Sequence, residues 1–339
     1  MLERVKVAVV GGTGFMGDLH AKVTFESDSA ELAAIVDLNE ELGEKAAEKY
    51  NTRYVKNVDD LLAEGSVDTF IVALPDRLHV DMTVKLLKAG KNVLLEKPMA
   101  DTLDGARKIA AAEKEGGGRL MIGQLLRFDP RYAQAAKAIR DGDIGDVVHV
   151  AAKRYSLRSV GIRMNGRSSV CFYLGIHDVD AMQWVTGKKI KSVYARAVSK
   201  VMPEHGVQSE DAIFANVEYE DGTIGSLNIS WALPDYAGGG ISAGLDIVGT
   251  KGILKVDTTD HGLNIQNRSG YSLPDGLHWP EVYGQTTGDL KEEVNHFVTA
   301  VRDGKPFRIS VEEAMLAVAV NDAVLKSVET GKIVEVETI

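Results

Sequence analysis

The fold class follows from the stretch Val5-Lys6-Val7-Ala8-Val9-Val10-Gly11-Gly12-Thr13-Gly14-Phe15-Met16-Gly17. Its first six residues form an almost wholly apolar run, which is typical of a buried parallel strand. The loop that follows contains the pattern G-x-G-x-x-G at Gly12, Gly14 and Gly17. These glycines suit a tight turn, close approach of the backbone to a pyrophosphate, and close packing of a helix on the strand. That helix would direct free N–H groups and its positive dipole end at the phosphates.

An acidic residue follows the glycine loop at a suitable distance. Asp37 ends the next predicted strand, 32–36, and lies 20 residues after Gly17, where a carboxylate can bind the adenine ribose hydroxyls. A carboxylate there would repel the 2′-phosphate of NADP, and the next residue is Leu38 rather than an arginine. The sequence therefore predicts NAD binding, with NADP less favoured. The alternatives are a structural glycine turn and, for Asp37, a role as a helix-capping or turn residue.

The pattern of apolar runs changes along the chain. Predicted strands at 5–10, 32–36, 69–74, 92–95 and 120–123 alternate with amphipathic stretches such as 79–89 and 103–114, which is typical of parallel βαβ units. Longer strands follow at 147–155, 191–198, 212–219 and 223–231, then a hairpin over 247–256 and helices at 289–302 and 311–330. We therefore predict an α/β fold with a Rossmann domain over 1–125 and an α+β domain over 126–339. The second domain has a large, mostly antiparallel sheet, and its glycine-rich flexibility is confined to 237–240.

Composition excludes several classes of function. The 339 residues carry a net charge of -10, which argues against a nucleic-acid partner. No apolar run approaches the roughly 20 residues that cross a bilayer, and the first residues do not resemble a signal peptide. The single cysteine, Cys171, excludes an internal disulfide and a cysteine-based metal cluster. We therefore expect a cytoplasmic two-domain protein without a metal ion.

Two further motifs carry a resemblance to a known family. Glu96-Lys97-Pro98 ends the fourth predicted strand and is preceded by Ala73-Leu74-Pro75 and His79. Gly175-Ile176-His177-Asp178-Val179-Asp180 lies in the second predicted domain. With the glycine loop, these motifs resemble the family of glucose–fructose oxidoreductase, inositol dehydrogenase and rhizopine-catabolism protein (Gfo/Idh/MocA) over nearly the whole chain.

The resemblance implies oxidation of a secondary hydroxyl on a sugar, cyclitol or derivative, with a hydride passing to NAD. Lys97 would bind the substrate hydroxyl, and His177, whose type of side chain titrates near neutral pH, would act as general base. Asp180 would bind substrate, hold His177, or simply pack in its helix. The cofactor would contact the following residues: Gly12, Gly14, Phe15, Met16, Gly17, Asp37, Leu38, Ala73, Leu74, Pro75, His79, Glu96 and Lys97.

One position departs from the family pattern. Many sugar and inositol dehydrogenases of this kind carry an aspartate four residues before the histidine, whereas this chain has Tyr173. A phenol can relay a proton but supplies no negative charge at neutral pH. We therefore expect Tyr173 to join the proton relay, to mark a different mode of substrate binding, or to accompany a loss of activity.

A basic run early in the second domain suggests a binding surface for acidic substrates. Lys153, Arg154, Arg158, Arg163 and Arg167 lie close together in an otherwise acidic chain. The plain interpretation is a solvated loop; the more specific hypothesis is that one or two of these arginines, Arg158 above all, bind a carboxylate or phosphate of the substrate.

Other substrate contacts follow from position and resemblance. Tyr155 lies within the basic run, and Arg127, just after the fifth strand, would border the nicotinamide.

Two other functions stay open: a glycosidase that retains NAD and oxidises its substrate transiently, and a non-catalytic NAD-binding protein. The resemblance also implies a homodimer or homotetramer formed through the open face of the second sheet. The specific substrate and the size of the oligomer do not follow from the sequence.

Overall fold

The computed structural model describes residues 3–237, 240–268 and 270–339. The predicted flexible stretch 237–240 and the first residues of the chain therefore lie partly outside the described residues. The chain divides into two compact units. Within the described residues, unit 1 comprises 3–128 and 277–314, and unit 2 comprises the rest. The prediction assigned everything after residue 125 to the second domain, so the placement of 277–314 in unit 1 differs from it.

Unit 1 is built on a parallel sheet of six strands. These are β1 (Val5–Val10), β2 (Ala30–Val36), β3 (Arg53–Val55), β4 (Thr69–Val72), β5 (Asn92–Glu96) and β6 (Arg119–Gly123), in the order β3-β2-β1-β4-β5-β6. The order in which the strands follow one another across the sheet reverses between β1 and β4. In such sheets, ligands bind at this point, beyond the carboxyl ends of the strands. The glycine loop and the turn Ala73–Pro75 flank it.

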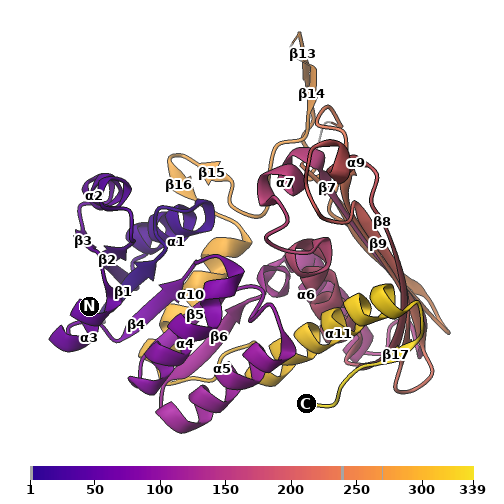
Figure 1. The fold of residues 1–339 in the computed structure, drawn as a ribbon, viewed down its shortest axis with the longest axis horizontal. Coiled ribbons are helices and arrows are strands. Elements are labelled where there is room, and N and C mark those ends of the chain that lie inside the picture. Colours follow the sequence, from indigo (N-terminus) through magenta and orange to yellow (C-terminus); the bar gives the residue numbers. More distant parts are fainter. Residues whose placement is uncertain (1–2, 238–239, 269) are drawn as a thin grey trace. The chain divides into compact units, whose positions relative to one another are not determined.

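Helices cover both faces of this sheet (Figure 1). They are α1 (Phe15–Glu26), α2 (Glu40–Lys49), α3 (Val58–Glu64), α4 (His79–Lys88), α5 (Leu103–Gly116) and α10 (Asp289–Arg302). Unit 1 also contains the short 3-10 turns η1 (Asp76–Leu78) and η2 (Leu125–Phe128) and the strands β15 (Glu281–Val282) and β16 (Gln285–Thr286). Side chains start some of them: Asn39 accepts a hydrogen bond from Leu42 N, and Thr102 accepts one from Gly105 N. Helix α10 packs against α1 and η2, which explains why 277–314 joins unit 1.

Unit 2 contains a mixed, mostly antiparallel sheet of seven strands. They are β7 (Val147–Leu157), β8 (Ile190–Val198), β9 (Ala212–Tyr219), β10 (Ile224–Leu233), β11 (Ile241–Gly249), β12 (Ile253–Asp257) and β17 (Val334–Glu335), in the order β12-β11-β7-β10-β9-β8-β17. Only the central pair β7–β10 is parallel. A separate hairpin joins β13 (Ile265–Asn267) to β14 (Gly270–Ser272).

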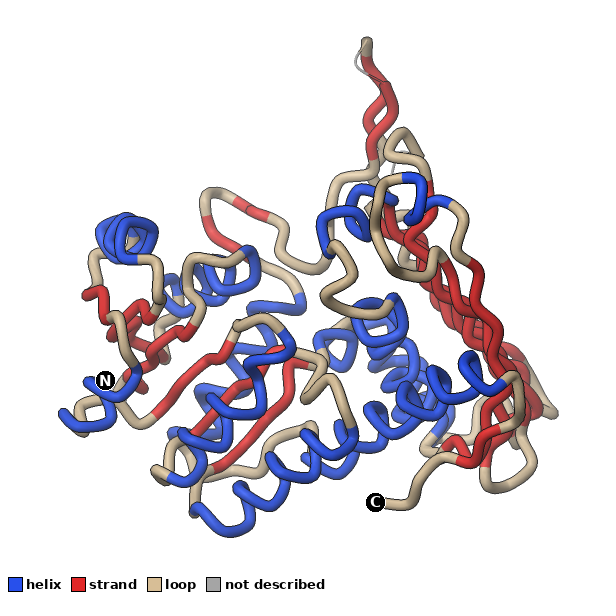
Figure 2. The backbone as a smooth tube through the Cα atoms, in the orientation of Figure 1, coloured by secondary structure: helices blue, strands red, loops and turns tan. Residues whose placement is uncertain are grey.

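The helices of unit 2 lie on one face of its sheet (Figure 2). They are α6 (Pro130–Arg140), α7 (Arg158–Met164), the π-helical turn η3 (Cys171–Gly175), α8 (Ile176–Thr186), α9 (Val201–Glu204) and α11 (Val311–Thr330), whose first turn belongs to unit 1. On β10 the covered face carries Leu227, Ile229 and Trp231, all buried, whereas Ile224 on the other face is exposed. The strand therefore buries one face against the helices and leaves the other uncovered.

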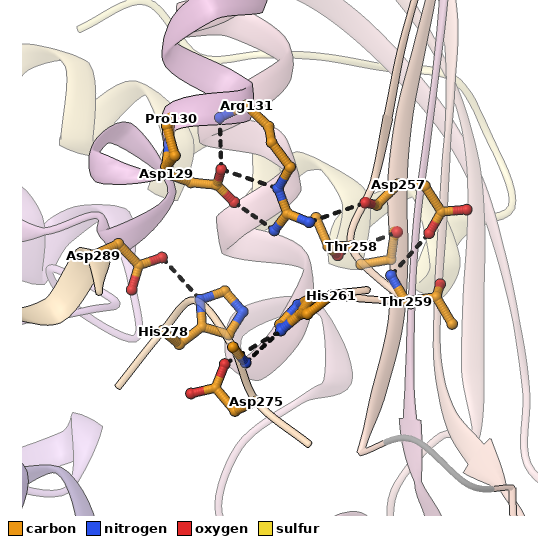
Figure 3. A network of polar contacts seen from close by, with 12 residues as sticks. Asp129, Pro130, Arg131, Asp257, Thr258, Thr259, His261, Asp275, His278 and Asp289 are labelled. Atoms are coloured by element: carbon orange, nitrogen blue, oxygen red, sulfur yellow. Dashed lines mark hydrogen bonds and ion pairs between the residues drawn. The ribbon is translucent and has the colours of Figure 1, made fainter. Parts of the chain in front are cut away.

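A polar network fixes the start of α6 to the end of β12 (Figure 3). Asp129 caps the helix by accepting a hydrogen bond from Arg131 N at 2.8 Å, and its other oxygen accepts one from the Arg131 guanidinium, also at 2.8 Å. The same guanidinium donates to the carbonyl of Asp257 at 3.1 Å. Asp129 is wholly buried, so its charge is compensated inside the unit by a cap and an ion pair.

No helix in the described part of the chain has the length and apolar character that crossing a membrane requires.

Candidate functional site

Two glycines allow the backbone around the glycine loop to pack very tightly. Gly11 has a φ of +81°, and a Cβ there would lie 2.6 Å from the carbonyl oxygen of Ala73. A Cβ on Gly17 would lie only 2.0 Å from the carbonyl oxygen of Gly11. Both distances are far shorter than real contacts, so no side chain fits at either position. The loop after β1 is thereby held directly against the end of β4 and the first turn of α1.

The start of α1 is open by comparison. Gly14 occupies the N-cap position and is exposed, and the atom nearest to a Cβ there is Gly11 O at 3.4 Å. Phe15 is 71% exposed and packs edge-on against Trp279, with ring centroids 5.8 Å apart. The backbone at Gly14 is therefore accessible to a ligand, and the free N–H groups of α1 suit a pyrophosphate.

Asp37 is fixed beside this loop. One carboxylate oxygen accepts hydrogen bonds from Thr13 Oγ1 at 2.7 Å and from Thr13 N at 3.3 Å, and the other accepts one from Asn39 N at 3.0 Å. The neighbouring Leu38 is 81% exposed. Asp37 thus serves as the turn residue that was weighed as an alternative, and its position beyond β2 still suits the ribose of a bound dinucleotide.

His79 connects the turns that follow β4 and β5. Its ring is wholly buried, with Nδ1 2.8 Å from the carbonyl oxygen of Pro98 and Nε2 2.8 Å from that of Leu74. This arrangement gives His79 a structural role; contacts of His79, Ala73, Leu74 and Pro75 with a cofactor stay predictions.

Glu96 orients the backbone at Lys97, at the carboxyl end of β5. Its Oε2 accepts a hydrogen bond from Lys97 N at 3.1 Å, and its Oε1 lies 2.7 Å from Nε2 of the buried His20. Burial opposes ionisation of Glu96, but the His20 hydrogen bond and the charges of His20, Lys97 and His79 hold its pKa below the ordinary value. Lys97 is partly exposed. The carboxylate therefore fixes the turn that presents Lys97 at the edge of the sheet.

In unit 2, a buried ion pair anchors the helix that carries His177. Arg154 on β7 donates from Nε to Asp178 Oδ2 at 2.6 Å and from Nη2 to Oδ1 at 3.2 Å. Both residues are at least 95% buried. Burial raises the pKa of Asp178, which the adjacent guanidinium opposes, and the carboxylate raises the pKa of Arg154 despite its burial. Arg154 thus anchors α8 and is not part of a solvated loop.

His177 and Tyr173 lie in consecutive turns of the same helical segment. Tyr173 is in the π-helical turn η3, and His177 follows in the first turn of α8. Both are half-buried, whereas Asp180 is buried. The ring of Tyr173 packs on that of Trp231, with centroids 6.2 Å apart. π-Helical turns are frequent at functional sites, and a proton relay between Tyr173 and His177 stays a prediction.

The other predicted substrate residues are placed less favourably. Arg127 is buried and donates to Glu313 at 2.8 Å. Tyr155 alternates with Arg154 along β7, so it lies on the sheet face opposite α8. Arg158 begins α7 and is half-buried, with Nη2 3.5 Å from the carbonyl oxygen of Ala232. The structure therefore does not bring Tyr155 together with His177, and contacts of all three with substrate stay predictions.

Two further members of the basic run lie at the end of α7. Arg163 and Arg167 are exposed, and the Arg167 guanidinium donates to the carbonyls of Met164 and Arg163 at the end of α7.

Comparison with known proteins identifies the family. A model described as "Oxidoreductase family, NAD-binding Rossmann fold" matches residues 5–124, and one described as "GFO/IDH/MocA C-terminal domain" matches residues 132–255. Inositol 2-dehydrogenase of Rubrobacter xylanophilus is 32% identical over 257 residues, which cover 75% of this chain and 72% of that protein. The chain belongs to the Gfo/Idh/MocA family. It is thus an oxidoreductase that acts on CH–OH groups with NAD, as the motifs predicted.

Two other Gfo/Idh/MocA relatives match almost the whole chain. The scyllo-inositol 2-dehydrogenase (NAD(+)) of Bacillus subtilis is 26% identical over 348 residues, covering 99% of this chain and 98% of that protein. A crystal structure of GenD2 from gentamicin A biosynthesis, in complex with NAD, superposes with a TM-score of 0.87 at 28% identity, covering 100% and 98% of the two chains. The predicted fold is confirmed.

The sequence did not indicate the structural roles of three residues that support the predicted motifs. Gly11 carries the positive φ in the glycine loop, although the fingerprint begins at Gly12. His20 holds Glu96 from α1, and Asp178 pairs with Arg154. A histidine on the buried face of α1 was the available signal for His20. Nothing local in the sequence marks Arg154 and Asp178 as partners.

Substitutions at Gly17 and Gly14 should separate packing from cofactor binding. We expect Gly17→Ala to lower the stability of the protein and to weaken its binding of NAD by about tenfold or more, because the added Cβ meets Gly11 O. Gly14→Ala should fold normally and lose affinity alone, since its Cβ has room but obstructs a phosphate. Thermal unfolding and NAD titration measure the two effects; full NAD affinity in Gly17→Ala would contradict this explanation.

The Arg154–Asp178 pair should behave as a buried ion pair. We expect Arg154→Met or Asp178→Leu alone to lower the free energy of unfolding by about 3–5 kcal/mol, because each leaves an uncompensated buried charge. The double variant should cost much less than the sum of the two. Urea denaturation of all four proteins forms the cycle, and strictly additive effects would show that the two charges are not coupled.

Proposed function

We propose that this protein oxidises a secondary hydroxyl of a cyclitol or related polyol to a ketone, reversibly. The observation that carries the proposal is Lys97, held by buried Glu96 at the carboxyl end of β5 near the point where the strand order reverses. The names of the inositol dehydrogenases among the relatives support the substrate class. GenD2, from gentamicin A biosynthesis, supports keeping other sugar derivatives within this class.

The residues divide the chemistry between them. Lys97 donates a hydrogen bond to the hydroxyl oxygen and favours its negative charge as the O–H bond breaks. His177 takes the hydroxyl proton as general base. NAD, when bound, would supply the acceptor for the hydride from the carbon that bears this hydroxyl, so the products would be a ketone, NADH and a proton. Tyr173 relays the proton onward from His177, in place of the aspartate found in many relatives.

The cofactor is NAD in preference to NADP. The open backbone at Gly14 accommodates the pyrophosphate, and the Asp37 carboxylate binds ribose hydroxyls and repels a 2′-phosphate. The fixed orientation of Asp37 through Thr13 and Asn39 supports this role, because the carboxylate is held in place before the cofactor binds.

The protein also assembles, in our proposal, as a homodimer or homotetramer through the uncovered face of the unit 2 sheet. That face exposes apolar side chains such as Phe214 on β9 and Ile224 on β10, which are 51% and 60% exposed.

Lys97 and His177 should both be needed for turnover. NADH production is followed with inositols, aldoses, uronates, sugar nucleotides and an aminoglycoside as substrates. We expect one class to react, and Lys97→Ala and His177→Ala each to lower kcat/KM by a factor on the order of 10²–10⁴. NAD titration of the same variants is the control and should show retained binding.

Two outcomes would overturn the proposal. Turnover that survives both substitutions would show that other residues do the chemistry. Bound NAD with no NADH from any substrate, but with cleavage of a glycoside, would identify the NAD-retaining glycosidase instead; NAD binding without either reaction would identify a non-catalytic protein.

Asp37 should set the cofactor preference. We expect Asp37→Ser to raise the ratio of NADP affinity to NAD affinity by about tenfold or more, because it removes the carboxylate that repels the 2′-phosphate. Titration of both cofactors measures this ratio without any substrate. Glu40→Ser, at an exposed glutamate nearby, is the matched control; an unchanged ratio in Asp37→Ser would refute the role of Asp37.

A further inference from the structure

Glu293 is a buried acid in unit 1 that the proposed reaction does not use. It lies in the second turn of α10 and is 1% exposed. A Cβ built on Gly123 would be 3.5 Å from Glu293 Oε2 and 3.6 Å from the Cα of Glu96. Gly123 and Glu96 are paired across β6 and β5. The Glu293 carboxyl group therefore reaches the carboxyl end of the two strands, next to the residue that orients Lys97.

The two carboxyl groups differ in their partners. Both oxygens of Glu96 are engaged, one with His20 and one with Lys97 N. Glu293 Oε1 is buried and has no hydrogen-bond partner among the described residues. A buried carboxylate with an unsatisfied oxygen is costly, whereas the neutral acid is much less so. The environment thus favours a charge on Glu96 and a proton on Glu293.

Nearby charges act in the same direction. Burial first, and then the negative charges of Glu96 and Asp289, raise the pKa of Glu293 well above its ordinary value. Asp289 precedes Glu293 by one turn of α10 and itself lies 2.8 Å from His278 Nδ1. The titratable groups around Glu96 and Glu293 are His20 from α1, Glu96 and Lys97 from β5, His79 from α4, and Asp289 with its partner His278.

We propose that Glu293 is a neutral carboxylic acid that acts as a positioning residue for Lys97. Its protonated side chain fills the space at the carboxyl ends of β5 and β6 without adding a second negative charge beside Glu96. Glu96 then stays a fixed anion on the backbone of Lys97. When Glu293 loses its proton, two adjacent buried carboxylates repel each other and the turn at Lys97 is disturbed. The charge state of Glu293 does not depend on the proposed function, whereas its effect on catalysis rests on that function.

This proposal gives a pH dependence of definite sign. The pKa of Glu293 is higher in the folded protein than in the unfolded chain, so its contribution to stability is complete below the unfolded value. That contribution is lost as pH rises from there through the raised folded value. Replacing Glu293 by glutamine removes the ionisation and should make stability fall less as pH rises.

Infrared spectroscopy tests the protonation directly. In wild-type protein labelled with [13C]glutamate, we expect a protonated-carboxyl band at neutral pH that shifts on labelling. The other glutamates with a displaced pKa, Glu64, Glu96 and Glu313, are displaced downward, and Asp178 is not labelled. The band should be lost in Glu293→Gln and kept in Glu292→Gln, an exposed neighbour on the same helix. Absence of a labelled band in the wild type overturns the proposal, even if Glu293→Gln fails to fold.

Two titrations extend the test to stability and catalysis. The urea midpoint of the wild type and of Glu292→Gln should fall between neutral and mildly alkaline pH by more than that of Glu293→Gln. The alkaline limb of kcat/KM should move upward by about one pH unit in Glu293→Gln. Parallel stability curves in all three proteins, or an unmoved alkaline limb in an active variant, overturn the proposal. If no polyol is oxidised, the infrared and urea results still decide the charge state of Glu293, and the failure belongs to the proposed function.

Discussion

Backbone packing around Gly11 is the constraint on which the nucleotide half of the site depends. The loop after β1 fits between Ala73 and the first turn of α1 only because Gly11 and Gly17 carry no side chain. That fit aligns the exposed N-terminus of α1, the turn after β4 and the fixed carboxylate of Asp37 at one edge of the sheet. Lys97 emerges at the same edge from β5. The glycine loop and the turn at Lys97 thus lie at the same edge of the sheet, which is where the proposed cofactor and reaction require them.

Buried polar groups hold the segments that carry Lys97 and His177. Glu96, hydrogen-bonded to His20, fixes the backbone of Lys97, and Arg154, paired with Asp178, fixes the helix that carries His177. A buried charge is tolerated only with a partner in good geometry, so each pair restrains the element that bears it. The side chains proposed to act on substrate are thus half-buried, while the groups that hold their segments are buried. Conformational freedom is removed where the chemistry needs fixed orientation.

Much of this could be predicted from the sequence. The glycine pattern and the alternation of apolar runs gave the parallel sheet, and the helices 289–302 and 311–330 are confirmed at both ends. Strand β3 was missed because three residues with one aromatic carry little periodicity. The return of α10 to unit 1 and the partners of Glu96 and Arg154 depend on contacts between residues distant in sequence. Local propensity and spacing contain no information about such contacts.

Transfer of a labelled hydride tests the central claim most directly. A polyol that the enzyme oxidises is prepared with deuterium on the carbon that bears the reacting hydroxyl, and the NADH formed in the presence of NAD is examined by NMR. The account predicts deuterium on C4 of the nicotinamide ring, together with the ketone derived from the polyol. NADH without deuterium, or a product formed with no transfer from that carbon to the nicotinamide, would contradict it.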